Sequence, residues 1–440
     1  MEEDWNARAR EDAHYYVAFG RRGQDNEEFF ATGSGLARAL AMELRRLPPA
    51  HPRSRRALEI GCGPGRLMKP LSRYVGEIHG VDVSEEMVRL ARENLRGIAH
   101  AHAHHAPEST LAAFADDSFD FVYSYAVFQH IPSAAVVYGY LREARRVLKP
   151  GGILRCQING LPESAARYDT WSGVRISAAE ISRFALEHAL QLLAREGTES
   201  QYMWITCRKQ PDGWRPARAE SGAAPARIRR ITNADSSEPA APPSGRFAAL
   251  SLWIENLPPE ADLNYLGVEV AGRAGVPTYI GPPEADGLQQ VNALLPPGLE
   301  TGLQPVGVFL GNEALCAPGV IRILPRPPAV PRVTAVTDGI NLMSGTRLVS
   351  RTVKVVLEEA DHPETFAAAI GGVPAAVDDI FCCDPRTPRH EINFHVPEEL
   401  PAGTYLLEMA LGRRSLAPVT VEVVRAASAS NGGTAETPPR

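Results

Sequence analysis

The chain has 440 residues, a formal net charge of −6 and a 44% share of hydrophobic residues. A length well above the ~100–200 residues of one domain predicts several folded domains. The mild acidity and the lack of a basic block argue against nucleic acid as a partner. No apolar run approaches the ~18 residues of a membrane-spanning helix. The acidic start Met1-Glu2-Glu3-Asp4 is unlike a signal peptide, so a cytoplasmic location is expected.

Residues 1–50 are predicted to be a helical segment in front of the first strand. Leucines at spacings of three and four share one helix face: Leu36, Leu40, Leu44 and Leu47. Ahead of that face, aromatic side chains crowd an otherwise charged stretch: Trp5, Tyr15, Tyr16, Phe19, Phe29 and Phe30.

The stretch 56–65, Arg-Ala-Leu-Glu-Ile-Gly-Cys-Gly-Pro-Gly, is the most informative part of the chain. Its apolar run predicts a buried strand. Gly61, Gly63 and Gly65 follow, and residues 66–74 can begin a helix. Glycine permits positive φ and a close approach of a ligand, and a helix N-terminus offers free N–H groups. Strand, glycine turn and helix together predict a nucleotide-type site.

The spacing of the glycines distinguishes between nucleotide sites. A dinucleotide fingerprint needs a third glycine at position 66, where the chain has Arg66, and the Gly-Lys-Ser/Thr of a phosphate-binding loop is absent. The pattern Glu-x-Gly-x-Gly-x-Gly from Glu59 to Gly65 resembles the first motif of class I S-adenosylmethionine-dependent methyltransferases.

Residues 77–83 predict a second strand that ends in an acid. Asp82 lies 17 residues after Gly65 (82 − 65). An acid at the carboxyl end of this strand can accept hydrogen bonds from both ribose hydroxyls; a solvated loop acid is the alternative. Ser84 is a good N-cap for the next helix, and the family resemblance places Met87 beside the adenine.

Two later segments extend the resemblance. Residues 114–124 resemble the approach to the family's fourth strand, and residues 142–152 resemble its connection into the fifth strand, with Pro150-Gly151-Gly152 stopping the helix. The resemblance implies a doubly wound, Rossmann-like, seven-stranded α/β domain with S-adenosyl-L-methionine as cofactor. The cofactor-binding residues that it implies are Glu59, Gly61, Cys62, Gly63, Gly65, Asp82, Val83, Met87, Glu108 and Tyr125.

Residues 124–132 follow the fourth strand at the edge where doubly wound folds bind ligands. His130 is therefore the candidate general base for a hydroxyl acceptor. The alternative is a histidine that hydrogen-bonds the backbone and shapes the loop.

The candidate acceptor residues are Tyr16, Trp171, Arg175 and Tyr202. Arg175 can hold an acidic acceptor, or it can pair with Glu180 or Glu187. In related methyltransferases an N-terminal segment often covers the cofactor; simple packing of residues 1–50 against the sheet is the alternative.

Histidines alternate with alanine near residues 100–105, which fits a third, edge-side strand. Carboxylate or cysteine partners at ligand spacing are missing, so no metal is predicted. The six cysteines, two of them adjacent at Cys382 and Cys383, do not form a disulfide framework.

The predicted organisation continues beyond the methyltransferase part. After a Pro-, Ala-, Ser- and Arg-rich stretch, short alternating strands with turn signals indicate two tandem immunoglobulin-like β-sandwiches. The predicted parts are a helical cap at 1–50, the methyltransferase domain at 51–210, a linker at 211–244, sandwiches at 245–328 and 329–425, and a disordered tail at 426–440. We expect residues 1–210 to fold and bind the cofactor alone.

The sequence therefore predicts a methyltransferase acting on a small-molecule or lipid-like acceptor. A protein or glycan acceptor presented by the sandwiches is the alternative, as is a non-enzymatic scaffold that keeps the cofactor fold. The intact glycines and Asp82 argue against the scaffold.

Overall fold

The computed structural model describes residues 1–18, 22–107, 110–163, 168–171, 173–216, 224–325, 330–339, 345–360, 362–384 and 388–424. The chain forms two compact units. The first contains residues 1–18 and 22–328, and the second contains residues 329–382 and the chain from 388 onward.

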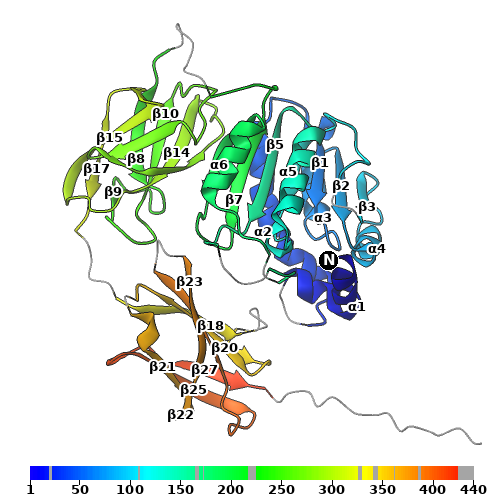
Figure 1. Ribbon diagram of the computed structural model, residues 1–440, viewed down its shortest axis with the longest axis vertical. Coiled ribbons are helices and arrows are strands. Elements are labelled where there is room, and N and C mark those ends of the chain that lie inside the picture. Colours follow the sequence, from blue (N-terminus) through cyan, green and yellow to red (C-terminus); the bar gives the residue numbers. More distant parts are fainter. Residues whose placement is uncertain are drawn as a thin grey trace, which may run out of the picture. The chain divides into compact units, whose positions relative to one another are not determined.

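Seven strands of the first unit form a Rossmann-like sheet in the order β3-β2-β1-β4-β5-β7-β6 (Figure 1). Strands β1 to β5 pair in parallel, and β7 is antiparallel to both β5 and β6. The apolar runs of β1 and β4 are almost completely buried, because helices cover both faces of the sheet. This order confirms the predicted α/β domain. The strands are β1 (Arg56–Ile60), β2 (Glu77–Asp82), β3 (Ala101–His105), β4 (Phe119–Ser124), β5 (Leu148–Ile158), β6 (Leu190–Glu196) and β7 (Met203–Lys209).

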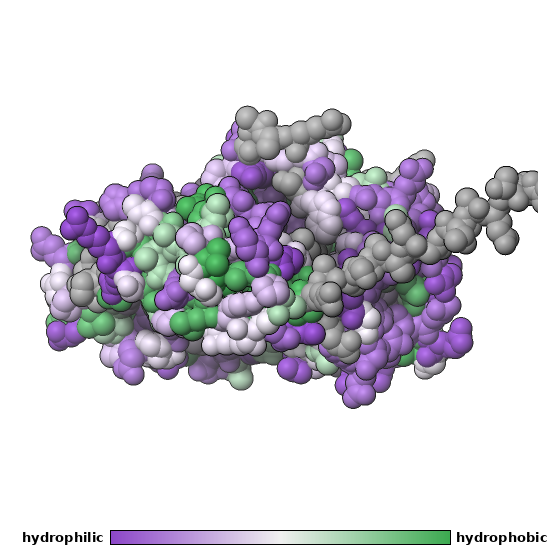
Figure 2. Space-filling view, turned by 90° about the horizontal axis from the view of Figure 1, so that it is seen from below, coloured by the Kyte–Doolittle hydropathy of each residue, from purple (hydrophilic) through white to green (hydrophobic). Residues whose placement is uncertain are grey.

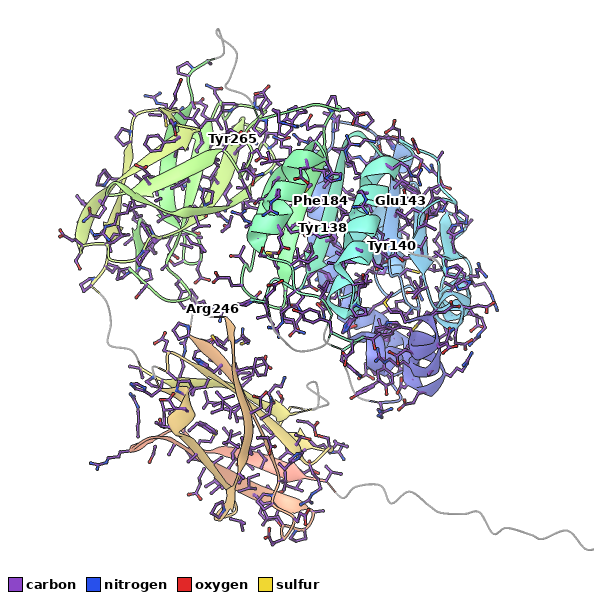
Figure 3. The ribbon with its side chains drawn as sticks, viewed as in Figure 1. Tyr138, Tyr140, Glu143, Phe184, Arg246 and Tyr265 are labelled. Carbon is purple, nitrogen blue, oxygen red and sulfur yellow. The ribbon has the colours of Figure 1, made fainter. Side chains whose placement is uncertain are left out.

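The helices start where the sequence provides caps. Ser84 accepts a hydrogen bond from the backbone N–H of Met87, and Ser177 and Glu180 form a capping box. Tyr138 of α5 stacks on Phe184 of α6 at 5.3 Å between ring centroids (Figure 3). The helices are α1 (Glu2–Ala18), α2 (Asn26–Glu43), α3 (Met68–Leu71), α4 (Glu85–Asn94), α5 (Ala134–Val147) and α6 (Ala178–Glu187). Short 3-10 segments cover Leu44–Arg46, Pro52–Ser54, Ser72–Tyr74, Phe128–His130 and Pro363–Thr365. Among the helices that the structure describes, none combines the length and the apolar character needed to span a membrane.

The rest of the first unit is an all-β part made of two sheets. One sheet has the order β13-β14-β10-β8 and the other the order β12-β11-β15-β17-β9, with β16 on β15. The strands are β8 (Arg227–Asn233), β9 (Ala240–Ala241), β10 (Ala249–Glu255), β11 (Leu266–Val270), β12 (Arg273–Ala274), β13 (Val276–Ile280), β14 (Leu288–Leu294), β15 (Gly302–Leu310), β16 (Glu313–Ala314) and β17 (Gly319–Ile323).

This β part continues the Rossmann-like sheet. Strand β13 pairs antiparallel with β6, with Tyr279 opposite Ala194, so the combined sheet has 11 strands. The buried Arg46 donates from Nη1 to the carbonyl of Ile280 at 2.5 Å, and its guanidinium lies 5.0 Å from the Tyr279 ring centroid. The Asp262 carboxylate accepts a hydrogen bond from the backbone N–H of Leu192. The edge of β6 is therefore paired by the β part.

The prediction that residues 211–244 form a linker is wrong for part of that range. Strand β8 lies within it as the last strand of one sheet, and β9 pairs in parallel with β17 in the other. The Arg-rich sequence of β8 misled the prediction because an edge strand with charged, solvent-facing side chains shows little apolar alternation. Four of its seven residues are partly or fully exposed before its buried end.

The second unit is also all-β. Its sheets have the orders β18-β20-β24-β23 and β19-β27-β25-β21-β22, with β26 on β25. Phe366 and Phe394 meet in its core at 6.3 Å between ring centroids. The strands are β18 (Arg332–Asp338), β19 (Arg347–Leu348), β20 (Thr352–Glu358), β21 (Phe366–Ile370), β22 (Val373–Ala375), β23 (Val377–Asp384), β24 (Arg389–His395), β25 (Gly403–Leu411), β26 (Arg414–Ser415) and β27 (Val419–Val423). The tail predicted at 426–440 lies outside the described residues.

Large apolar side chains also occur on the surface. On the face shown in Figure 2, hydrophobic residues are interspersed with hydrophilic ones. Single exposed apolar residues such as Met42, Leu303 and Val320 are ordinary on a folded protein and need no partner to explain them.

The paired edge of β6 leads to a prediction about truncation. A chain ending at residue 328 is expected to unfold in one cooperative transition. A chain ending at 210 is expected to have a lower Tm and to aggregate, because it loses the partners of Arg46, Leu192 and the β6 edge. Each buried group left without a partner costs about 1–3 kcal/mol. Thermal unfolding and size-exclusion chromatography compare the two chains.

The variant Asp262→Ala in the longer chain tests one of these contacts, because it removes the acceptor of the Leu192 N–H together with a local bond from the N–H of Asn264. An equal Tm for the chains ending at 210 and 328 would contradict the prediction.

Candidate functional site

The glycine loop after β1 has a backbone that only glycine adopts without strain. Gly61, Gly63 and Gly65 have φ values of +73°, +50° and +83°. A Cβ atom at Gly61 would lie 2.3 Å from the side chain of Val127. The N–H groups of Gly61 and Cys62 both donate to the carbonyl of Val81, at 2.8 and 3.0 Å. The loop is thereby held against the carboxyl end of β2.

Asp82, the last residue of β2, connects this loop to helix α4. Its Oδ2 accepts from the N–H of Gly63 and its Oδ1 from the N–H of Ser84, both at 2.9 Å. Desolvation by the surrounding chain raises the pKa of Asp82, although both hydrogen bonds act to lower it. Each carboxylate oxygen can accept a further bond, so the group can bind two adjacent hydroxyls.

Glu59 lies on β1 and is buried beneath the loop. Its Oε2 accepts a hydrogen bond from the hydroxyl of Tyr123 on β4 at 2.8 Å. Burial raises the pKa of Glu59 to about 8. The nearby Arg66 is buried and lies 5.4 Å from the ring centroid of Tyr125. Glu59 is thus fixed by a neighbouring strand of the sheet, and the side chains of Arg66 and Tyr125 are further polar groups of this region.

Helix α1 packs on the start of α4, next to the glycine loop. Asn6 Oδ1 accepts from the hydroxyl of Ser84 at 2.7 Å and from the N–H of Glu86 at 3.1 Å. Ala9 and Ala13 pack against the buried Met87. Figure 1 shows α1 beside α4 at this edge of the sheet. The sequence singled out the aromatic residues of this segment but missed Asn6, which carries no motif.

His130 follows β4 and is buried. Its Nδ1 lies 3.0 Å from the carbonyl of Thr170, so the ring donates there and keeps its lone pair on Nε2. Burial, assisted by the nearby Arg8 charge, lowers the pKa of His130 to about 4, although the hydrogen bond to Thr170 acts to raise it. The Trp5 ring meets the imidazole edge-on at 5.6 Å. The ring is therefore neutral near pH 7.

The predicted acceptor residues are only partly gathered. Tyr16 and Trp171 lie 6.2 Å apart between ring centroids. Arg175 donates to the carbonyl of Pro162 at 2.7 Å, and the Glu180 carboxylate bonds to Ser177 in the capping box. Tyr202 lies just before β7 and is 51% exposed.

Other predicted residues have these positions. Tyr125 stacks on Trp204 of β7 at 5.7 Å between ring centroids, and both side chains pack against the core. The carbonyl of Val83 lies 3.1 Å from Nε2 of His105. Cys62 is a buried thiol, and burial raises its pKa. Glu108 lies outside the described residues.

The histidines of β3 lie against a histidine of β2. Nδ1 of His79 lies 2.9 Å from Nε2 of His104, and Nε2 of His79 lies 2.9 Å from the carboxylate of Glu77. Within the described ranges, no group of three or more His, Cys, Asp or Glu side chains is arranged to hold a metal ion.

The buried Glu59 leads to a prediction about stability and pH. Because its folded pKa of about 8 exceeds the unfolded value of 4.5, its contribution is fully present below pH 4.5 and is lost as the pH rises towards 8. Glu59→Gln keeps an acceptor for Tyr123 but cannot ionise. The variant should therefore gain stability relative to the wild type between pH 5 and 8, by about 1.4 kcal/mol per unit of pKa shift removed.

Urea unfolding of the full chain at several pH values measures this difference. Glu93→Gln, at an exposed position on α4, is the matched control. Parallel pH profiles for Glu59→Gln and the wild type would show that Glu59 is ionised in the fold.

Comparison with known proteins agrees with this geometry. Residues 58–156 match the family model described as "Methyltransferase domain". A 37.1 kDa uncharacterized protein in transposon TN4556 of Streptomyces fradiae is 33% identical over 146 residues, 32% of this chain and 38% of that protein. Ubiquinone biosynthesis O-methyltransferase of Ruegeria pomeroyi is 36% identical over 114 residues, 25% of this chain and 44% of that protein.

Solved structures are more distant. A SAM-dependent methyltransferase from Aquifex aeolicus is 19% identical and has a TM-score of 0.29, with 40% of this chain and 97% of that chain covered. The chain spans only about two fifths of the curated relatives' length, 38% and 44% in the two cases above. The family match lies in the strands and loops that form the site: residues 58–156 match a methyltransferase domain, and they run from β1 to β5 of the Rossmann-like sheet.

Proposed function

We propose that this chain is a methyltransferase that transfers the methyl group of S-adenosylmethionine to a small-molecule or lipid-like acceptor. The observation that carries the proposal is the hydrogen bond between the Gly63 N–H and the Asp82 carboxylate. It sets the glycine loop and an acid side by side at the carboxyl ends of β1 and β2, where doubly wound folds bind nucleotides.

In this proposal the cofactor is held by the loop, the acid and helix α4. Gly61, Gly63 and Gly65 give close access to the backbone, and Asp82 accepts the ribose hydroxyls. The other proposed cofactor residues are Glu59, Cys62, Val83, Met87, Glu108 and Tyr125. Helix α1 covers this site, because Met87 is 1% exposed beneath Ala9 and Ala13.

S-adenosylmethionine supplies an electrophilic methyl group on its sulfonium. The protein has to align the acceptor with that group and exclude water. His130 is proposed to take the proton of a hydroxyl acceptor on Nε2 while the acceptor oxygen bonds to the methyl carbon; the bond between that carbon and sulfur would break, with S-adenosylhomocysteine as the leaving group. The bond that His130 donates to the carbonyl of Thr170 holds the required tautomer. Tyr16, Trp171, Arg175 and Tyr202 remain the proposed acceptor residues.

A macromolecular acceptor is the second candidate, because the first β part is joined to the methyltransferase sheet through β6 and β13. We infer that both β parts are immunoglobulin-like sandwiches. In each, the strands corresponding to A, B, E and D form one sheet, as β8, β10, β14 and β13 or as β18, β20, β24 and β23. A sandwich held against the enzyme can present a protein or a glycan to it.

The cofactor site is tested by two variants. Asp82→Ala removes the acceptor of two hydroxyls, worth about 2–3 kcal/mol, and should weaken binding by about 30-fold or more. Gly63→Val places a branched side chain at a φ of +50°, facing Val17, and should abolish binding. Calorimetric titration with S-adenosylmethionine measures both variants.

Glu85→Ala, an exposed acid at the start of α4, is the control and should bind normally. Normal affinity in folded Asp82→Ala protein would refute the assignment of the cofactor site.

The role of His130 is tested by His130→Gln. If His130 is the base, kcat for a hydroxyl acceptor should fall about 100-fold or more while cofactor affinity is kept. In the wild type, the pKa of about 4 keeps the ring neutral at pH 5 to 7, so His130 should impose a loss of rate only as the pH falls towards 4.

An acceptor screen with labelled S-adenosylmethionine supplies the substrate for this assay, and His102→Gln, at a 42%-exposed side chain on β3, is the control. Unchanged kcat in His130→Gln would support the loop-shaping role instead.

A further inference from the structure

We propose that Arg8 of helix α1 determines acceptor specificity by binding an acidic group, so that the acceptor is an anion with a flat apolar body. This inference rests on the proposed methyltransferase function and names the substrate class of the same site. No sequence motif marks Arg8, and two of its partners, Thr170 and Trp171, come from a segment far away in the chain.

The guanidinium of Arg8 is held between two indole rings. Its Cζ lies 4.7 Å from the ring centroid of Trp5 and 4.4 Å from that of Trp171. Arg8 is 7% exposed. The two indoles favour the positive charge of the guanidinium, whose N–H groups point outward in its own plane.

The two terminal nitrogens of the Arg8 guanidinium differ: Nη2 has hydrogen-bond partners among the described residues, and Nη1 has none. Nη2 donates to the hydroxyl of Thr170 at 3.0 Å and lies 3.1 Å from the carboxylate of Asp4. Nη1 is buried and has no hydrogen-bond partner among the residues that the structure describes. Buried donors are rarely left unpaired, so an unpaired charged N–H in a candidate site points to a ligand acceptor atom.

Arg8 lies next to the candidate base. Thr170 bonds to Arg8 through its hydroxyl and to His130 through its carbonyl. The Trp5 ring that packs on the guanidinium also meets the His130 ring at 5.6 Å. In the same loop, Oε1 of Gln129 is buried and unpaired within the described part of the chain. Nη1 of Arg8 and Oε1 of Gln129 are therefore two buried polar atoms without described partners, and both belong to side chains close to His130.

These contacts define the chemistry of the ligand. Carboxylate and phosphate oxygens are the acceptors that match a guanidinium edge best. The indoles and the Tyr16 ring, whose centroid is 6.0 Å from Cζ of Arg8, suit a flat apolar body. Arg175 fits this role less well, because its Nη1 already donates to Pro162 and its side chain is only half-buried.

The test measures binding of matched anionic and neutral probes to the full chain, with S-adenosylhomocysteine at saturation. The pairs are benzoate and benzamide, phenyl phosphate and phenol, and indole-3-acetate and indole-3-acetamide. We expect at least one anion to bind the wild type 10-fold or more tightly than its neutral twin. R8Q should abolish that preference, R8K should retain part of it, and the exposed control R10Q should retain all of it. Comparison of the two carboxylate pairs with the phosphate pair shows whether the site prefers a carboxylate or a phosphate group.

Two further readouts separate direct contact from a structural role. S-adenosylhomocysteine affinity should change less than about 3-fold in R8Q. T170V removes the bond that ties Arg8 to the loop but keeps the charge, so it should retain most of the anion preference. The proposal is overturned if no anion is preferred, if R8Q binds anions like the wild type, or if T170V loses the preference as fully as R8Q. A wild type that fails to bind S-adenosylhomocysteine refutes the proposed function instead.

Discussion

The candidate site depends on the carboxylate of Asp82 and the backbone N–H groups around it. One oxygen holds the glycine loop through Gly63, and the other holds the first turn of α4 through Ser84. The hydroxyl of the same Ser84 donates to Asn6 of α1. A single short side chain at the end of β2 thus fixes a loop and a helix, and through Ser84 it connects to helix α1. A longer or uncharged side chain could not hold both N–H groups in this geometry.

The sequence predicted this centre because its parts are local. A buried strand, three glycines and an acid at the end of the next strand lie within residues 56–82, and each has a direct physical reason. The capping box at Ser177 and Glu180 is equally local, since its donors and acceptors lie within one helical turn.

The features that the sequence did not predict are contacts between distant segments and a strand without an apolar pattern. Arg8 and Thr170 are 162 positions apart, and nothing in either segment indicates that they meet. The pairing of β13 with β6 is equally hidden, because an edge strand's free N–H and C=O groups accept any strand of suitable twist. Residues 227–233 were predicted to be part of a linker, because an exposed edge strand does not need alternating apolar side chains.

The pairing of β6 with β13 also changes what the first β part does for the enzyme. An unpaired edge strand exposes a row of backbone donors and acceptors and invites aggregation. In this chain the exposed edge is moved to β8, where arginines at 227, 229 and 230 discourage such pairing. The β part therefore protects the methyltransferase sheet whatever it binds, and a role in presenting an acceptor would be additional to that structural role.

Helix α1 has to satisfy two opposing demands if it covers the cofactor. It must exclude water during transfer and still open to admit the cofactor. Its contact with Met87 is made largely by Ala9 and Ala13, whose small side chains bury little apolar area. Polar bonds supply the remainder: Asn6 holds α4, and Arg8 with Asp4 holds the loop at Thr170. Such a helix is attached by a few directional contacts rather than by a large core, so its position depends on whether those contacts are complete. An acceptor that pairs with the free edge of Arg8 would complete them, which would favour closure of the site when the acceptor is present.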